Sequence, residues 1–251
     1  MSEVRTEGTD AVIDSLFSVG AHFGYRRAKR HPTAAPFLFG VKGGVEIIDL
    51  PQTKKALLAA EEFVKGLAHS GKTLLFVGGK REASEAVRLG AEKVGMPFVS
   101  GRWIGGTLTN FGQIRSRIDK MLDLGAKREK GELAKYTKKE RLVIDREVTR
   151  LEELFHGLIP LAALPAALFV VDPGREHTAV GEARKRDIPI VALASSDCDM
   201  SLLNYPIPGN DASRASISFI VERIAAAYEA GKSEARNPKS ETNPNDQHQK
   251  S

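Results

Sequence analysis

The sequence contains very little cysteine, and this excludes two common ways of stabilising a fold. Cys198 is the only cysteine among 251 residues. An internal disulfide therefore cannot form, and a zinc site built from several cysteines is excluded. A chain of this kind fits a reducing compartment, so we expect it in the cytoplasm.

Long hydrophobic runs are absent as well. The longest stretch without a charged side chain, residues 157–171, is interrupted by Pro160 and Pro165. It falls short of the roughly 20 apolar residues that a membrane-spanning helix needs. The first residues include Glu3 and Glu7 but no apolar run. We therefore expect neither a membrane partner nor a secretory signal.

The formal net charge is only +5, but the charge is unevenly distributed along the chain. Residues 1–150 carry 27 basic and 18 acidic side chains, whereas residues 151–251 carry 10 and 14. No acid lies between Ser15 and Val45, where five cations occur: Arg26, Arg27, Lys29, Arg30 and Lys42. Clustered cations displace counterions from a phosphate backbone, so a polyanionic partner is one interpretation. A solvated surface is the other.

After residue 50, short apolar runs alternate with helical patterns. The runs 74–77, 98–100, 167–171, 189–193 and 205–207 have the length of buried strands. The segments 52–68, 82–94, 176–186 and 212–230 have helical periodicity. This alternation predicts an α/β fold with a parallel sheet and helices on both of its faces. Before it, residues 37–41 and 45–49 flank Lys42-Gly43-Gly44, which predicts a β-hairpin.

One segment interrupts the alternation. Apolar residues spaced by three and four predict two helices packed on each other, joined by the polar stretch 125–139. The members of this seam are Phe111, Ile114, Ile118, Met121, Ile144, Val148, Leu151 and Phe155. We predict a discontinuous α/β domain of residues 1–108 and 156–230 and an inserted antiparallel helical hairpin of residues 109–155. Residues 231–251 are polar and predict a disordered tail.

Two glycine-containing turns suggest phosphate contacts. Residues 66–73 match the phosphate-loop pattern G-x-x-x-x-G-K-T, but a helix precedes them and a strand follows. A phosphate loop needs the opposite order, so we interpret the match as a helix end. Gly78-Gly79-Lys80-Arg81 does follow a strand and open a helix. We expect Lys80 and Arg81 to contact phosphate there, the alternative being a flexible turn.

The segment from Arg102 to Phe111 combines an arginine, the only tryptophan, two glycines and several Thr and Asn donors. Such a loop lets backbone approach a partner while Arg102 and Asn110 contact phosphate or ribose. In the alternative interpretation Trp103 anchors the core, and Thr109 or Asn110 caps the following helix. The two interpretations are compatible.

No catalytic constellation is visible in the sequence. The six histidines form no H-E-x-x-H motif, and no G-x-S-x-G motif occurs. Asp197-Cys198-Asp199 follows a strand at the edge where α/β enzymes gather metal ligands, but a second convergent cluster is missing, which favours a capped turn. We predict no catalytic residue, no metal, no cofactor and no small-molecule substrate.

Several blocks of sequence together resemble the bacterial S-two family of small-subunit ribosomal proteins. In chain order they are residues 20–31, 39–50, 75–81, 102–111, 164–172, 176–177 and 207–211. The resemblance covers about residues 11–230. It implies a flavodoxin-like five-stranded domain with an inserted coiled-coil hairpin, located between the head and body of the small subunit. It also implies binding to small-subunit ribosomal RNA and neighbouring proteins, and help in docking the large mRNA-binding ribosomal protein.

The sequence departs from the family pattern at Ser195 and Asn204, where acidic residues are common, so we predict no bound cation there. On the RNA-binding hypothesis the contact residues are Arg26, Arg27, Lys29, Arg30, Lys80, Arg81, Arg102, Asn110, Arg115, Arg117 and Lys120. The alternative is a doubly wound α/β enzyme binding a phosphorylated ligand at the carboxyl edge of its sheet. A protein-docking scaffold that uses the hairpin and the acidic C-terminal half is a third possibility.

Overall fold

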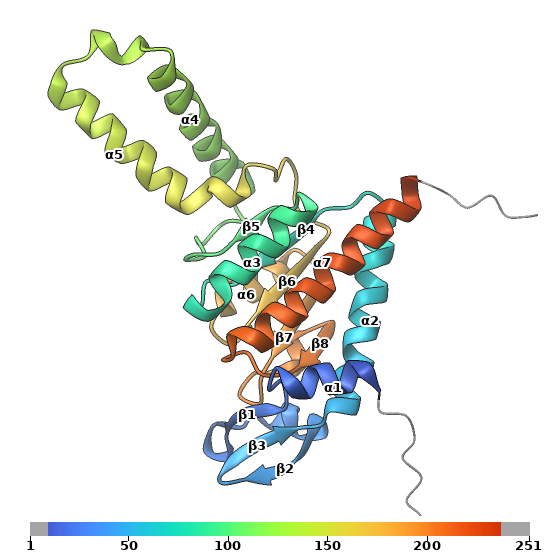
Figure 1. The fold of residues 1–251 in the computed structure, drawn as a ribbon. Helices are drawn as coiled ribbons and strands as arrows, with labels where there is room; N and C mark the ends of the chain where they lie inside the picture. The colour runs from blue at the N-terminus through green and yellow to red at the C-terminus, as the bar shows by residue number, and fades with distance from the viewer. Residues whose placement is uncertain (1–9, 237–251) are drawn as a thin grey trace, which may run out of the picture.

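The protein is built on a parallel β-sheet, seen in a computed structural model that describes residues 10–236 (Figure 1). Five strands lie in the order β5-β4-β6-β7-β8 and pair in parallel. They are β4 (Leu74–Val77), β5 (Phe98–Val99), β6 (Ala167–Val171), β7 (Ile190–Ala194) and β8 (Tyr205–Pro208). Numbered from β4 this order is 2-1-3-4-5, the flavodoxin-like order, so the predicted fold class is confirmed.

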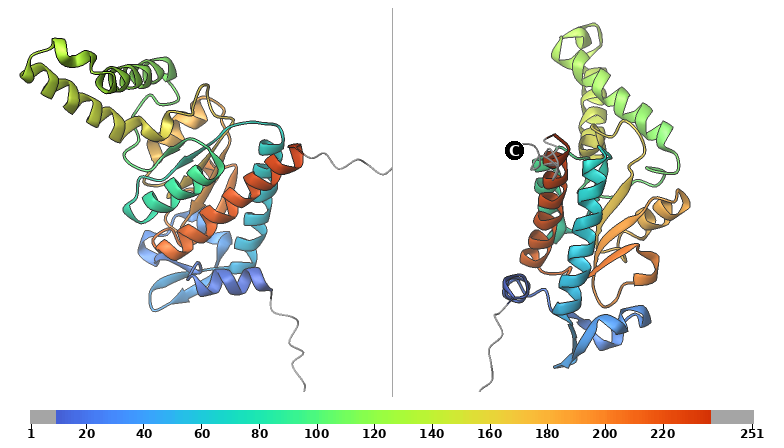
Figure 2. Two further views of the ribbon diagram at one scale, coloured as in Figure 1. Left: turned by 45° about the horizontal axis from the view of Figure 1, so that its top comes forward. Right: turned by 90° about the vertical axis from the view of Figure 1, so that its right-hand side faces the viewer.

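The sheet is covered on both faces, which explains why its strands are continuously apolar. Leu74 and Phe76 of β4 pack into one core with α2 (Leu50–His69), α3 (Arg81–Val94) and α7 (Arg214–Arg236). Leu75 and Val77 pack into a second core with α6 (His177–Lys185) and the base of the inserted helices. Successive side chains of a strand point to opposite faces, and Figure 2 shows α6 across the sheet from α2 and α7.

A second, antiparallel sheet precedes the large one and lies near its carboxyl edge (Figure 1). Its order is β1-β3-β2, with β1 (Phe23–Arg26), β2 (Leu38–Lys42) and β3 (Val45–Ile48). Gly43 and Gly44 have positive φ values of 59° and 79°, as the predicted hairpin turn between β2 and β3 requires. The sequence did not predict β1, nor the preceding helix α1 (Ala11–Ser18), which Asp10 caps at the amide of Val12.

The inserted segment forms two helices that project from the α/β body (Figures 1 and 2). They are α4 (Phe111–Glu129) and α5 (Lys138–Phe155), and seam residues such as Ile118 and Val148 are fully buried between them. The predicted linker 125–139 is wrong at both ends, because α4 continues to Glu129 and α5 begins at Lys138. The helices fall inside the predicted range 109–155, whose status as a separate domain stays a prediction.

Two further boundaries can be compared with the sequence. Helix α2 ends before residues 70–73 and β4 follows, so the phosphate-loop pattern has the reversed order that we predicted. The predicted disordered tail is wrong for residues 231–236, because α7 continues to Arg236. Gly231 packs so closely on α2 that an added Cβ would lie 2.2 Å from the Lys65 carbonyl oxygen, and Lys65 pairs with Glu234 at 2.8 Å. Residues 237–251 lie outside the described residues.

Among the described helices, none combines the length and the apolar character that crossing a membrane requires.

Candidate nucleic-acid interface

The small sheet is fastened to the carboxyl edge of the large sheet, where the loops after β4, β6, β7 and β8 gather. The Tyr25 amide donates to Ser196 Oγ at 2.8 Å, and the His31 amide donates to the Ser196 carbonyl at 2.8 Å. Gly24 lies so close that an added Cβ would be 2.8 Å from Ser196 Oγ. The segment between β1 and Pro32 is thus held at both ends against this edge.

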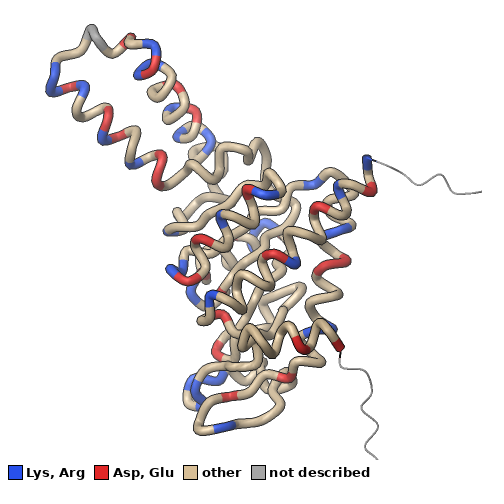
Figure 3. Tube along the Cα trace, in the orientation of Figure 1, with Lys and Arg blue, Asp and Glu red and all other residues tan. Residues whose placement is uncertain are grey.

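Four exposed cations lie on that segment and form what we call the basic run: Arg26, Arg27, Lys29 and Arg30. A short 3₁₀ turn, Arg27–Lys29, spaces them around the backbone. Arg30 Nη1 lies 3.5 Å from Glu46 Oε1, and Lys29 Nζ lies 5.6 Å from the centre of the Tyr25 ring. In the described part of the chain, Arg26 and Arg27 form no ion pair, so both guanidinium groups are available to an anion. Figure 3 marks the positions of Lys and Arg in blue along the backbone trace, including those in the region of the small sheet.

Lys80 does not lie on this surface, which corrects its assignment to RNA contact. The residue is 8% exposed, and its ammonium nitrogen lies 3.0 Å from Asp172 Oδ2 and 3.3 Å from Asp211 Oδ1. It also donates to the Tyr25 hydroxyl at 3.2 Å. The ammonium thus holds together the loops after β4, β6 and β8 and the small sheet. We call Lys80, Asp172, Asp211 and Tyr25 the Lys80 cluster.

The protonation of the cluster follows from its burial. Burial alone would lower the pKa of Lys80, but the charges of Asp211 and Asp172 outweigh it and raise that pKa above its usual value. Burial and the neighbouring Asp172 raise the pKa of Asp211 to about 7, against the opposing attraction of Lys80. Asp211 Oδ2 is buried without a hydrogen-bond partner, which explains why the charged form is disfavoured.

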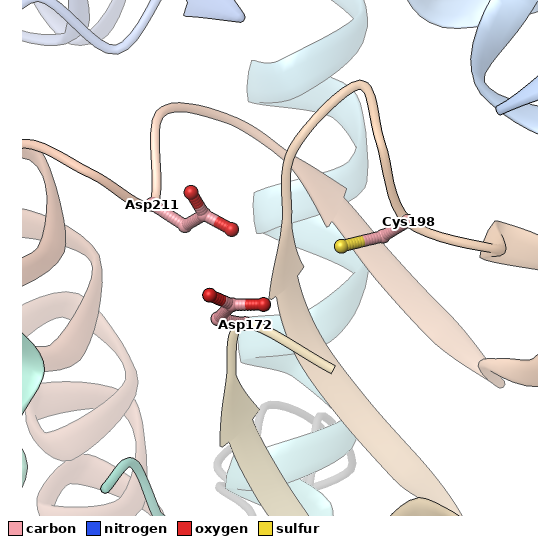
Figure 4. Close-up of side chains that lie close together, drawn as sticks. All are labelled: Asp172, Cys198 and Asp211. Carbon is pink, nitrogen blue, oxygen red and sulfur yellow. The ribbon is translucent and has the colours of Figure 1, made fainter. Parts of the chain in front are cut away.

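Asp172, Cys198 and Asp211 each offer one possible metal ligand, and these atoms lie within 4.8 Å of one another (Figure 4). The donor set suits a metal poorly, because the Lys80 ammonium already lies on both carboxylates. Burial, followed by the charge of Asp197, raises the pKa of the Cys198 thiol to about 12, so the thiolate that binds metals is scarce at neutral pH. The chemistry of the group is that of an internal ion cluster.

The loop of residues 102–110, the Arg102 loop, is organised by a residue that the sequence analysis missed, Glu182 of α6. One carboxylate oxygen accepts from Trp103 Nε1 at 3.1 Å and from the Gly106 amide at 2.7 Å. The other accepts from the amides of Leu108 and Thr109 at 2.9 and 3.0 Å. Burial opposes ionisation, but the backbone hydrogen bonds led by that from Thr109 lower the pKa of Glu182. The sequence contains one indication of this role: Glu182 is an acidic residue on the otherwise apolar face of the helical segment 176–186.

Different side chains of the Arg102 loop serve the two roles considered for it, core anchoring and partner contact. Trp103 is 8% exposed and belongs to the second core, so the core-anchor interpretation holds for this side chain. Arg102 and Asn110 are exposed. Asn110 is the N-cap residue of α4, but its side chain makes no capping hydrogen bond. Both side chains are therefore available to a partner on the outer surface of a fixed loop.

The hairpin cations differ in their surroundings. Arg115 is half-buried, donates to the carbonyls of Ile159 and Leu161 at 3.2 and 3.4 Å and pairs with Asp119. It therefore fastens the base of the hairpin. Lys120 pairs with Glu147 across the hairpin at 2.6 Å. Arg117 is exposed.

The chain is similar to proteins of one family over most of its length. The family model described as ribosomal protein S2 matches residues 16–231. A protein of Coprothermobacter proteolyticus named small ribosomal subunit protein uS2 is 42% identical over 220 residues, which cover 88% of this chain and 82% of the relative. Proteins of the same name from Nocardia farcinica and Rhodopirellula baltica are 41% and 40% identical, covering 87% and 90% of this chain and 77% and 86% of the relatives.

Proposed function

The chain belongs to the ribosomal protein S2 family, and on this premise we propose that it is a structural constituent of the small ribosomal subunit that binds ribosomal RNA through the basic run. The observation that supports the RNA contact most strongly is the exposure of four cations within five positions on a fastened segment. A segment held at both ends loses little conformational freedom when phosphates bind. Its action is positioning, and its place is the ribosome in the cytoplasm.

Other exposed side chains extend the proposed RNA contact beyond the basic run. They are Arg81 at the start of α3, Arg102 and Asn110 of the Arg102 loop, and Arg117 on the hairpin. Lys80 and Arg115 are engaged within the protein, and Lys120 shares its charge with Glu147. The proposed contact surface therefore loses Lys80 and Arg115, whereas Lys120 stays exposed on it.

We also propose that the chain lies between the head and body of the subunit and helps to dock the large mRNA-binding ribosomal protein. Exposed aromatic side chains at the N-terminal end support a protein partner: Phe17 is 63%, Phe23 47% and Phe39 81% exposed. The rings of Phe17 and Phe23 lie 4.6 and 4.1 Å from that of His22. Exposed apolar surface of this kind marks protein-binding sites.

We expect no enzymatic activity. An α/β enzyme of this topology binds its ligand in the crevice at the carboxyl edge, where the strand order reverses. Between β4 and β6 this crevice contains the Lys80 ammonium and its two carboxylates. Tyr25 of the small sheet covers the same point. Internal ion pairing therefore takes the place of a phosphorylated ligand at the centre of the edge.

The test is the salt dependence of binding to small-subunit ribosomal RNA. We expect the variant with Gln at positions 26, 27, 29 and 30 to bind with a slope of log K against log salt that is smaller by about 3, because each lost phosphate contact removes about 0.7–0.9. A control variant loses four exposed cations elsewhere: Lys55, Lys72, Lys93 and Lys185. Equal slopes for the two variants would overturn the role of the basic run.

A further inference from the structure

We propose that Arg81, Arg175 and Arg214 form a second site for phosphate groups, separate from the basic run. The proposal rests on the RNA-binding function and names an additional site for it. Arg175 and Arg214 belong to no motif of the sequence analysis. They come from the loop after β6 and the first position of α7, whereas Arg81 is the first residue of α3.

The three arginines line one hollow on the surface at the carboxyl edge. Its volume is about 530 Å³, and Gly79, Ser84, Glu85 and Arg88 complete its wall. A second hollow of about 580 Å³ shares Gly79 and Arg175 with the first and adds Arg102. The two hollows therefore form one continuous surface that extends from Arg214 to Arg102.

The charge of this surface is net positive, because the arginines that line the two hollows outnumber the acids. Arg81, Arg175 and Arg214 are exposed, and none of them forms an ion pair within residues 10–236. Glu85 is the one acid that lines the first hollow, and the acid that lines the second, Glu176, is buried and accepts from the Gly79 amide at 3.1 Å. Like charges brought together from three elements repel one another, so the arrangement favours an anion between them.

Phosphate is the anion that fits this chemistry best. A guanidinium group offers parallel N–H donors that match two phosphate oxygens. The first amides of α3 and α7 add the positive ends of two helix dipoles beside Arg81 and Arg214. The floor at Gly79 leaves no room for a side chain, because a Cβ would lie 2.2 Å from the Gly101 carbonyl oxygen. The two joined hollows suit successive phosphates.

The experiment compares the full chain with the variant Arg175→Gln/Arg214→Gln. The control variant, Lys55→Gln/Lys72→Gln, removes the same charge from exposed positions of α2 and the turn after it. One arm measures the salt slope of binding to small-subunit ribosomal RNA, and the other measures binding of inorganic pyrophosphate by calorimetry. Trp103 fluorescence verifies that each variant is folded.

We expect the RNA slope of the arginine variant to fall by about 1.4–1.8 relative to the control, because two phosphate contacts are lost. If the arginine variant loses pyrophosphate binding but keeps the RNA slope of the control, the phosphate site is supported, and its ligand is a free phosphate compound and not the RNA. If both arms give the same result for the two variants, the proposal is wrong. If the unmodified chain fails to bind the RNA, the proposed function is wrong, whereas the pyrophosphate arm still decides the second site. The variant Arg175→Lys/Arg214→Lys keeps the charge and should keep the RNA slope.

Discussion

Replacing Lys80 by methionine tests the role of the Lys80 cluster in holding the carboxyl edge together. The substitution keeps most of the side-chain volume but removes the charge that faces two carboxylates. Asp211 is fully buried and Asp172 is 13% exposed at its side chain, so water cannot replace the ammonium. Removing one partner of a buried ion pair costs about 3–5 kcal/mol of the free energy of unfolding. This loss corresponds to a urea midpoint lower by about 1 M or more.

The pH dependence gives the same prediction a second, independent readout. The folded-state pKa of Asp211, about 7, lies above its unfolded value. Its protonation therefore stabilises the fold at low pH, and this contribution is lost as pH rises from about 4 to about 7. Without Lys80 the pKa of Asp211 rises further, so the deficit of the variant should be larger at pH 8 than at pH 5.

Urea unfolding of both proteins, followed by Trp103 fluorescence at pH 5 and pH 8, measures these quantities. The control is Lys65→Met, which breaks a surface pair with Glu234. Surface pairs contribute little, so its midpoint should stay close to that of the unmodified chain. The reasoning is refuted if Lys80→Met unfolds at the same midpoint as the control, or if its deficit is the same at both pH values.

Two further substitutions, the second with a matched control, test the loop anchor and the base of the hairpin. Glu182→Gln replaces a charged acceptor by one carbonyl oxygen, so it should lower the free energy of unfolding by about 3 kcal/mol. It should also change the fluorescence of Trp103 in the folded state, and unchanged emission would contradict the anchoring role of Glu182. Gly157→Ala should lower it by about 1–3 kcal/mol, because the new Cβ would lie 2.3 Å from the Phe98 carbonyl oxygen. Gly125→Ala, in open space within α4, should instead raise it by up to about 1 kcal/mol, and equal effects at the two glycines would contradict the packing argument.

The large sheet was predictable because its strands are buried on both faces and therefore apolar throughout, as in the run from Ala167 to Val171. Strand β1 lacks that signal, since two of its four residues are exposed and two are half-buried. Helix α1 is short and fully buries only Leu16. Strand β1 thus has no pattern that distinguishes it from a loop, whereas α1 has the helical spacing of Val12, Ile13 and Leu16 after Asp10, a signal that the sequence analysis passed over.

For the candidate site, the structure bears on exposure alone: the cations of the basic run are exposed, and their contact with RNA stays a prediction. Lys80 was assigned to the surface because its partners, Asp172 and Asp211, are 92 and 131 positions away in the sequence. Arg175 could not be placed from the sequence for the same reason: it lies near Arg81 only because β6 pairs with β4 in the folded sheet. Local patterns indicate which residues are charged, whereas topology decides which charges neutralise one another.

The most direct measurement of the central claim is co-sedimentation of the full chain with small ribosomal subunits that lack this protein. A structural constituent held by phosphate contacts should sediment with the subunits at about 0.15 M salt and be released at about 1 M salt, because counterions then compete with the arginines. Failure to sediment at the lower salt concentration would contradict membership of the subunit. Retention at the higher concentration would contradict the electrostatic basis of the contact.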